Sequence, residues 1–72
     1  MKSKEQIAFA KKLGKRIASI RKEKELSQLD LANKARINEK YLGRVERGES
    51  EISAYKLTRV TKVLKISIGD LI

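Results

Sequence analysis

Cysteine, histidine, proline and tryptophan are all absent from this chain of 72 residues. Without cysteine the chain can form no disulfide and no thiolate metal site. Without histidine it lacks the commonest general base and the commonest metal ligand. No phosphate-cradling glycine loop and no suitably spaced carboxylates take their place. We therefore expect no enzyme, no cofactor and no metal site, and so short a chain leaves no room for a domain that senses a small-molecule ligand.

Long apolar runs are also missing. No stretch approaches the ~18 residues that can cross a bilayer, and no segment resembles a signal peptide. The absence of proline and a charged fraction of 38% suit a helical protein with a solvated surface. A length of 72 residues corresponds to one domain, residues 1–72, with a marginal hydrophobic core. The sequence thus predicts a single all-α domain that is soluble, cytoplasmic and not bound to a membrane.

Charge of one sign dominates the chain. Eighteen basic residues against nine acidic ones give a formal net charge of +9, and residues 1–24 alone contribute +7 from nine basic and two acidic side chains. Such a surplus indicates a polyanionic partner or merely good solubility. The cluster formed by Lys11, Lys12, Lys15 and Arg16 has the same two interpretations, attraction to DNA or a solvated surface, and we favour the second.

Hydrophobic periodicity and capping residues predict five helices. Apolar residues recur at spacings of three and four from Ile7 to Ile20, which is typical of one long amphipathic helix. Gly14 within it marks either close packing of another element or a tolerated glycine. Serine and asparagine N-caps precede the later helices, and Gly48 ends the third. The expected helices span residues 4–24, 28–35, 39–47, 54–64 and 68–72.

The second and third helices form a pair that is typical of a DNA-binding helix-turn-helix. Apolar residues stand where two short helices that cross at a tight turn must touch. They are Leu31, Ala32, Ala35, Ile37, Leu42 and Val45. On a helical wheel the opposite face of the third helix is basic. We therefore expect this helix to lie in the major groove of double-stranded DNA.

The chain resembles the helix-turn-helix domain of the Cro/phage-repressor type, the XRE family, over about residues 13–72. Matching pieces occur in each predicted helix. They are Leu13-Gly14-Lys15-Arg16-Ile17, Ile20-Arg21, Leu26-Ser27-Gln28, Leu31-Ala32, Val45-Glu46-Arg47-Gly48, Leu57, Leu64 and Ser67. The resemblance implies a compact five-helix, lambda-repressor-like fold, a homodimer and binding to an operator through the third helix.

Base readout is assigned to the N-terminal residues and the exposed face of the third helix, namely Glu39, Lys40, Gly43 and Arg44. Arg44 is the best candidate for a bidentate contact with a guanine, and Lys40 could make a similar but less rigid contact. Glu39 could accept from a cytosine amino group. Gly43 would let the helix backbone approach the DNA. The alternative is an ordinary solvated basic surface.

Phosphate contacts are assigned to Gln28, Asn38, Tyr41 and Arg47. Gln28 opens the second helix, where free N–H groups and the helix dipole favour a phosphate oxygen. The resemblance implies that this glutamine also braces the first recognition residue. For Tyr41 a partly packed side chain that supports the helix is an equal alternative.

Two further sets of residues have structural roles that the resemblance implies. Arg21 and Glu46 would form an ion pair that braces the third helix, although Arg21 could share its guanidinium with a phosphate. The C-terminus would pair two subunits across a two-fold axis, because it holds more apolar side chains than a small monomer can bury. These dimer candidates are Ile66, Ile68, Leu71 and Ile72. The alternative is that they complete the monomer core.

The chain departs from the family pattern in three respects. Arg36 stands at a turn position that is usually glycine, so either it adopts a left-handed conformation or the turn differs. Glu49 and Glu51 lie in the loop that approaches phosphate in relatives, which weakens the case for a backbone contact there. Thr61 replaces a small apolar residue, so its hydroxyl needs a partner on its own helix.

These features predict a sequence-specific transcriptional regulator that acts as a homodimer on a near-palindromic operator, in the cytoplasm and associated with the nucleoid. The segment from Tyr41 to Gly48 looks like that of restriction–modification controller proteins, while a Cro-like phage switch or an antitoxin is nearly as well supported. RNA polymerase or a toxin would be the protein partner of such a regulator. The alternative function is an antitoxin-type interaction module that binds a partner protein and binds DNA only as part of that complex.

Overall fold

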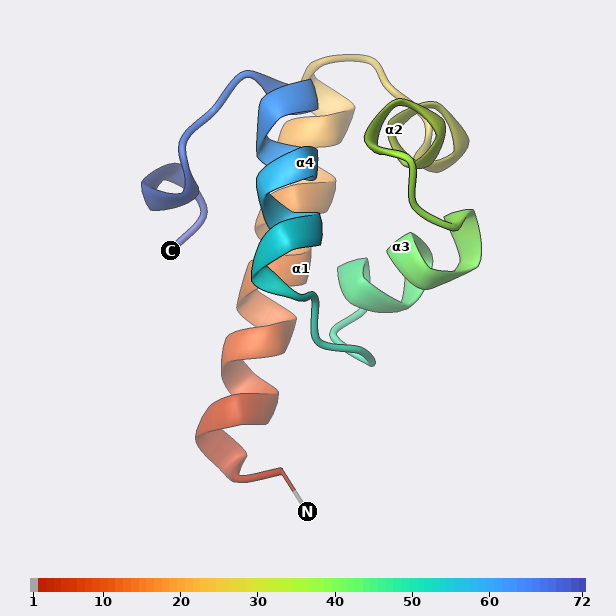
Figure 1. Ribbon diagram of the computed structural model, residues 1–72. Coiled ribbons are helices and arrows are strands. Elements are labelled where there is room, and N and C mark those ends of the chain that lie inside the picture. Colours follow the sequence, from red (N-terminus) through yellow and green to blue (C-terminus); the bar gives the residue numbers. More distant parts are fainter. Residues whose placement is uncertain (1) are drawn as a thin grey trace.

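The computed structural model describes residues 2–72, which contain four α-helices and no strand. Figure 1 shows their arrangement. The helices are α1 (Lys4–Glu23), α2 (Gln28–Ala35), α3 (Glu39–Glu46) and α4 (Ala54–Leu64). The predicted all-α class is confirmed, and the predicted ends of these four helices agree with the structure to within one residue.

The predicted fifth helix is wrong, because the C-terminal segment forms only a short 3-10 turn, Ile68–Asp70. Its backbone bonds join residues three apart, from the Asp70 N–H to the Ser67 carbonyl and from the Leu71 N–H to the Ile68 carbonyl. Gly69 disfavours a longer helix in this segment. Leu71 is buried and fixes the direction of the chain immediately after the turn.

Local hydrogen bonds explain where the helices begin. The Ser27 hydroxyl accepts from the Asp30 N–H at 2.9 Å, and the Asp30 carboxylate accepts from the Ser27 N–H at 3.0 Å. Interactions of the Asp30 carboxylate with Ser27, first with its backbone N–H and then with its side chain, hold the pKa of Asp30 below its ordinary value. At α3 the Asn38 side-chain oxygen accepts from the N–H groups of Lys40 and Tyr41. Each start therefore has a partner for its first free N–H groups.

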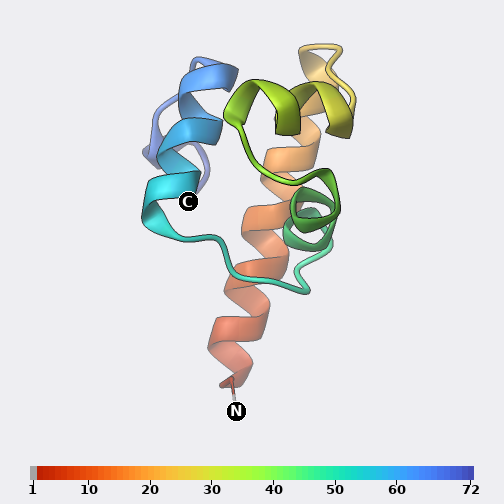
Figure 2. The same cartoon turned by 45° about the vertical axis from the view of Figure 1, so that its right-hand side comes forward.

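The core lies where the four helices meet. Ile17, Leu31, Leu42 and Leu64, one from each helix, are completely buried. The α3 helix packs on α1, and α2 packs on both α3 and α4. Figures 1 and 2 both show the first turns of α1 extending beyond the other helices. Among residues 2–72, no helix has the length and apolar character needed to cross a membrane.

A close approach of α1 and the end of α3 explains Gly14. A methyl group added at Gly14 would lie 2.7 Å from the carbonyl oxygen of Glu46 and closer still to that of Val45. Of the two interpretations of Gly14, close packing of another element is therefore the one that the structure supports. The glycine lets the backbone at the end of α3 pack directly against α1, and this contact determines the position of α3 along α1.

The structure also resolves two of the departures from the family pattern. Arg36 adopts the left-handed conformation, with φ of 58°, in the turn between α2 and α3. The Thr61 hydroxyl donates to the Thr58 carbonyl of its own helix at 2.9 Å. Both residues therefore fit the fold without changing its turns.

Candidate nucleic-acid interface

The helix expected to read DNA is tied to α1 by a buried ion pair. Arg21 Nε lies 2.7 Å from Glu46 Oε2, and Arg21 Nη2 donates to Glu46 Oε1 at 2.9 Å. Arg21 Nη1 donates to the Leu26 carbonyl at 2.8 Å. The guanidinium therefore uses all of its nitrogen atoms within the protein. This geometry fits the bracing role expected of the pair, and burial of the Arg21 side chain leaves little of it accessible to a phosphate.

Gln28 joins the same carboxylate from α2. Its Nε2 donates to Glu46 Oε1 at 2.8 Å. The resemblance implied a brace on the first recognition residue, whereas this hydrogen bond goes to the last residue of α3. One buried carboxylate thus connects α1, α2 and α3.

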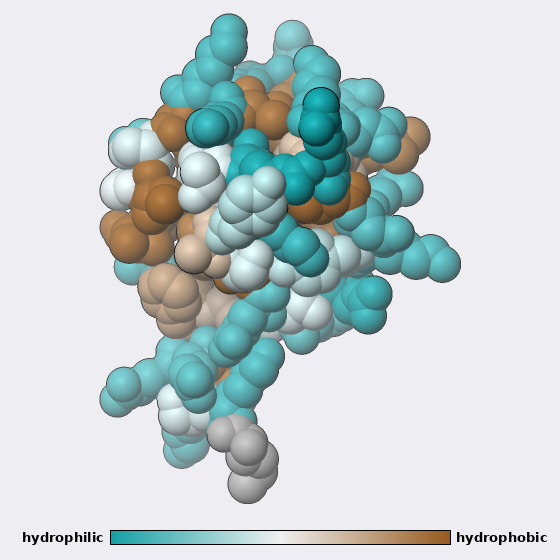
Figure 3. Space-filling view, viewed as in Figure 1, coloured by the Kyte–Doolittle hydropathy of each residue, from teal (hydrophilic) through white to brown (hydrophobic). Residues whose placement is uncertain are grey.

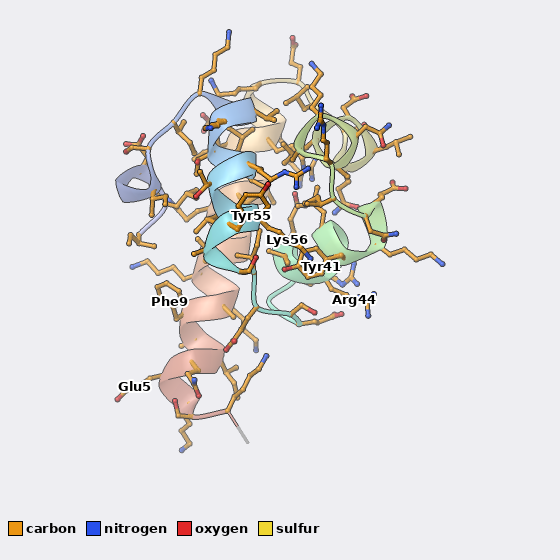
Figure 4. The ribbon with its side chains drawn as sticks, viewed as in Figure 1. Glu5, Phe9, Tyr41, Arg44, Tyr55 and Lys56 are labelled. Atoms are coloured by element: carbon orange, nitrogen blue, oxygen red, sulfur yellow. The ribbon has the colours of Figure 1, made fainter. Side chains whose placement is uncertain are left out.

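The exposed face of α3 borders a shallow open hollow. Its lining residues come from the start of α2, from α3 and from the loop that follows it. They are Gln28, Glu39, Lys40, Gly43, Arg44, Arg47 and Glu49. Most of the residues assigned to DNA contact therefore lie together. Figure 4 shows Arg44 on the opposite side of the molecule from Phe9 of α1.

Gly43 was expected to let the backbone of α3 approach DNA, and in this structure two side chains lie over it. It is buried, and a methyl group added to it would lie 3.2 Å from Arg47 Nη1 and 3.6 Å from Gln28 Oε1. These two side chains cover the glycine. Its role in this structure is to make room for them.

Arg47 forms an ion pair that sequence reasoning missed. Its Nε and Nη2 donate to the two carboxylate oxygens of Glu49 at 2.9 and 3.2 Å. The hydrogen bond to Arg47 lowers the pKa of Glu49, and the same bond raises the pKa of Arg47. Gly48 lies between them with φ of 76°, a conformation that favours glycine and that turns the two side chains together. In the sequence, only the glycine that ends α3 indicated the turn that brings Arg47 and Glu49 together.

Tyr41 and Asn38 do not line this hollow, and both make structural contacts. The Tyr41 hydroxyl donates to the Glu51 carbonyl at 3.0 Å, and the Lys56 ammonium lies 4.5 Å from the centre of the ring. Figure 4 shows Lys56 of α4 beside Tyr41. The packed alternative therefore describes Tyr41 better than a free phosphate ligand. Asn38 uses its side-chain oxygen as the cap of α3, and its amide nitrogen has no partner among residues 2–72.

A second group of cationic and aromatic side chains lies on α4 and was not expected from the sequence. The guanidinium of Arg59 lies 5.4 Å from the centre of the Tyr55 ring and donates to the Arg36 carbonyl at 3.2 Å. This contact supports the left-handed turn before α3.

The C-terminal residues expected at a dimer interface divide into two groups. Leu71 is only 1% exposed and belongs to the monomer core, so its assignment to the interface is wrong. Ile66 is half-buried, whereas Ile68 and Ile72 are exposed, Ile72 at 65%. Phe9 is 53% exposed and borders the same small hollow as Ile72. Figure 3 shows the apolar surface over the C-terminal segment, and Figure 4 places Phe9 on that side.

The arrangement of α2 and α3, with a basic exposed face on α3, defines a DNA-binding helix-turn-helix protein. Residues 17–71 match the family described as helix-turn-helix. The chain belongs to this family, in its Cro/phage-repressor (XRE) type, whose members are DNA-binding transcriptional regulators and not a class of enzymes.

Individual relatives agree with this family. The chain is 37% identical over 60 residues to the immunity repressor protein of Bacillus phage phi105, covering 83% of this chain and 42% of that repressor. It is similar to the restriction–modification controller protein C.AhdI from Aeromonas hydrophila, with a TM-score of 0.88 and 32% identity over 90% of this chain and 98% of that one. It is also similar to the clp gene regulator ClgR from Corynebacterium glutamicum, with a TM-score of 0.85 and 32% identity over 88% of this chain and 67% of that one.

Proposed function

We propose that this chain is a sequence-specific transcriptional regulator that binds a near-palindromic operator as a homodimer, with α3 of each subunit in the major groove. The observation that carries the proposal is the contact of buried Glu46 with both Arg21 and Gln28. It fixes the inner side of α3 to α1 and α2, while the outer side stays open to solvent. A rigidly held helix with a free basic face suits the reading of base edges.

Within this proposal, Glu39, Lys40 and Arg44 contact base edges because they lie at the N-terminal and central part of the exposed face of α3. Gln28 and Asn38 contact phosphates, since each lies at the start of a helix, where the positive end of the helix dipole favours an anion. Tyr41 supports this surface by packing against Lys56 and the loop.

The dimer surface that we propose consists of Phe9, Ile66, Ile68 and Ile72. Apolar side chains of this size on one exposed face are typical of a protein interface. The face lies on the opposite side of the molecule from Arg44 in Figure 4. A two-fold axis there would place the two α3 helices less than two subunit widths apart. For a molecule of 32 × 24 × 21 Å, even two of the shortest widths exceed the ~34 Å helical turn of DNA, so a spacing of one turn is within reach.

Selection from randomised duplex DNA at about 150 mM salt tests the proposal. We expect enrichment of a two-fold symmetric site whose half-sites are one helical turn apart, as two linked recognition helices require. Retention of DNA without enrichment would mean that the charge of the chain binds DNA nonspecifically. That result would contradict the proposed function and favour a module that needs a protein partner.

The biological setting that we favour is control of a restriction–modification operon, because the likeness to C.AhdI extends over 98% of that chain. The genes beside this one test the setting. An adjacent endonuclease or methyltransferase gene is expected. An adjacent toxin gene would instead favour the antitoxin alternative.

A further inference from the structure

The side chain of Arg47, although exposed, folds back across α3. A methyl group added to Gly43, one turn earlier, would lie 3.2 Å from Arg47 Nη1. On its other side the guanidinium is held by both carboxylate oxygens of Glu49. Gly43 and Glu49 therefore define the position of a side chain that would otherwise have many rotamers.

Folding stability does not explain this ion pair. The side chains of Arg47 and Glu49 are 57% and 54% exposed, and exposed ion pairs add little to stability. Glu49 also places a negative charge at the edge of the hollow that Lys40 and Arg44 border. Such a charge repels DNA, so its presence calls for a compensating contribution to binding.

The chemistry of the guanidinium indicates what that contribution is. An arginine has five N–H donors in a fixed plane. Glu49 uses the edge formed by Nε and Nη2, while Nη1 has no partner among residues 2–72. The edge formed by Nη1 and the second N–H of Nη2 is left as two parallel donors. Such an edge matches a pair of acceptors, either O6 and N7 of a guanine or two oxygens of a phosphate.

We propose that Glu49 is a positioning residue for DNA binding: it holds Arg47 across Gly43 so that the free edge of the guanidinium binds a pair of acceptors on the DNA. This inference rests on the proposed function and adds a residue to it. Because Glu49 fixes the arginine before DNA arrives, less side-chain freedom is lost on binding. The carboxylate thereby favours binding through Arg47 although its own charge opposes it.

A double-mutant cycle on the operator selected by the wild-type chain tests the proposal. The variants are Glu49→Gln, Arg47→Ala and their combination, and Glu51→Gln is the matched control for loss of one negative charge in the same loop. We expect Glu49→Gln to weaken binding by at least about twofold in the wild-type background. In the Arg47→Ala background, Glu49→Gln should instead leave binding unchanged or tighten it, and we expect the same of Glu51→Gln.

The same variants identify the acceptor pair. If Arg47 binds a guanine, Arg47→Ala relaxes one base step of the operator and leaves the salt dependence unchanged. If it binds a phosphate, the loss is equal for all sequences and the slope of log affinity against log salt falls by about 1.

The proposal is overturned if Glu49→Gln tightens binding by the same factor in both backgrounds, because Glu49 would then act only through its charge. It is also overturned if the tightening is greater when Arg47 is present, because Glu49 would then compete with DNA for the arginine. In both cases the wild-type chain still binds its operator, so the proposed function stands. A wild-type chain that binds no DNA would overturn both.

Discussion

The carboxylate of Glu46, in the last turn of α3, lies 2.7 Å from the Nε of Arg21, near the end of α1. Both side chains are buried, so the pair is shielded from solvent and salt. The same carboxylate accepts a hydrogen bond from Gln28. The position of α3 therefore depends on one buried charge with three hydrogen bonds.

Replacing Glu46 with alanine should destabilise the protein strongly, because it leaves the Arg21 guanidinium buried without its partner. The expected loss is roughly 3–5 kcal/mol, which lowers the Tm of a chain of this size by about 12 °C or more. Thermal unfolding followed by circular dichroism measures it, with Glu51→Ala, on the exposed loop, as the control. If Glu46→Ala left both Tm and DNA binding unchanged, the bracing role would be wrong.

A double variant separates stability from positioning. Replacing the pair with apolar residues, as in Arg21→Met with Glu46→Leu, removes both buried charges and should recover much of the lost stability. Operator affinity should stay below that of the wild type, because Gln28 loses the acceptor that orients it. Recovery of full affinity in a DNA titration would show that the orientation of Gln28 does not matter.

Gly14→Ala should also be destabilising, although alanine favours helices by about 1 kcal/mol over glycine. The added methyl group would meet the carbonyl oxygens at the end of α3, so one of the helices must move. Overpacking of this kind costs about 1–3 kcal/mol. Gly69→Ala is the control, because its methyl group would meet only the Ser67 hydroxyl at 3.6 Å. Equal Tm values for the two variants would contradict the close approach of α1 and α3.

Phe9→Ser should weaken the dimer by about tenfold or more without lowering monomer stability to the same degree, because Phe9 is exposed in the monomer and lies in the proposed interface. Sedimentation equilibrium over a range of concentrations measures the effect. Tyr55→Ser is the control, since Tyr55 is also an exposed aromatic residue but lies on α4. The same dissociation constant for both variants and the wild type would exclude Phe9 from the interface.

The stability of α2 should depend on pH through Asp30. The pKa of this carboxyl is lowered by the hydrogen bonds from Ser27, so its ionised form is favoured in the folded state. The resulting stabilisation is fully present above the ordinary value of 3.8 and is lost as the pH falls through the lower folded value. The Tm of wild type should exceed that of Asp30→Asn by a constant amount from pH 7 to about pH 5 and converge with it in acid. If the difference in Tm between wild type and Asp30→Asn persisted at low pH, the proposed dependence of stability on the ionisation of Asp30 would be contradicted.

Most of the fold follows from local sequence signals. Ser27, Asn38 and Ser53 cap their helices through bonds to residues two or three positions ahead, so a linear reading of the chain finds these starts. The C-terminal helix was predicted wrongly for the opposite reason. The burial of Leu71 against residues distant in sequence, together with Gly69, determines the course of the chain there.

In the candidate site, too, local patterns predicted some features, whereas contacts between side chains determine the others. The wheel of α3 placed Lys40 and Arg44 on the exposed face, because helical periodicity alone determines it. The bond of Gln28 to Glu46 and the fold of Arg47 over Gly43 depend on side-chain rotamers and on a left-handed turn at Gly48. No periodic pattern carries that information.

The central claim is that α3 reads bases, and Arg44 tests it most directly. The affinities of wild type and Arg44→Ala should be compared on the selected operator and on operators with each base pair changed in turn. We predict that Arg44→Ala lowers the affinity for the operator by about 5- to 150-fold. On operators in which the base pair read by Arg44 is already changed, in each half-site, the variant should lose little further affinity. An equal loss on every sequence would mean that Arg44 contacts only the DNA backbone, and it would contradict the claim that this face of α3 reads bases.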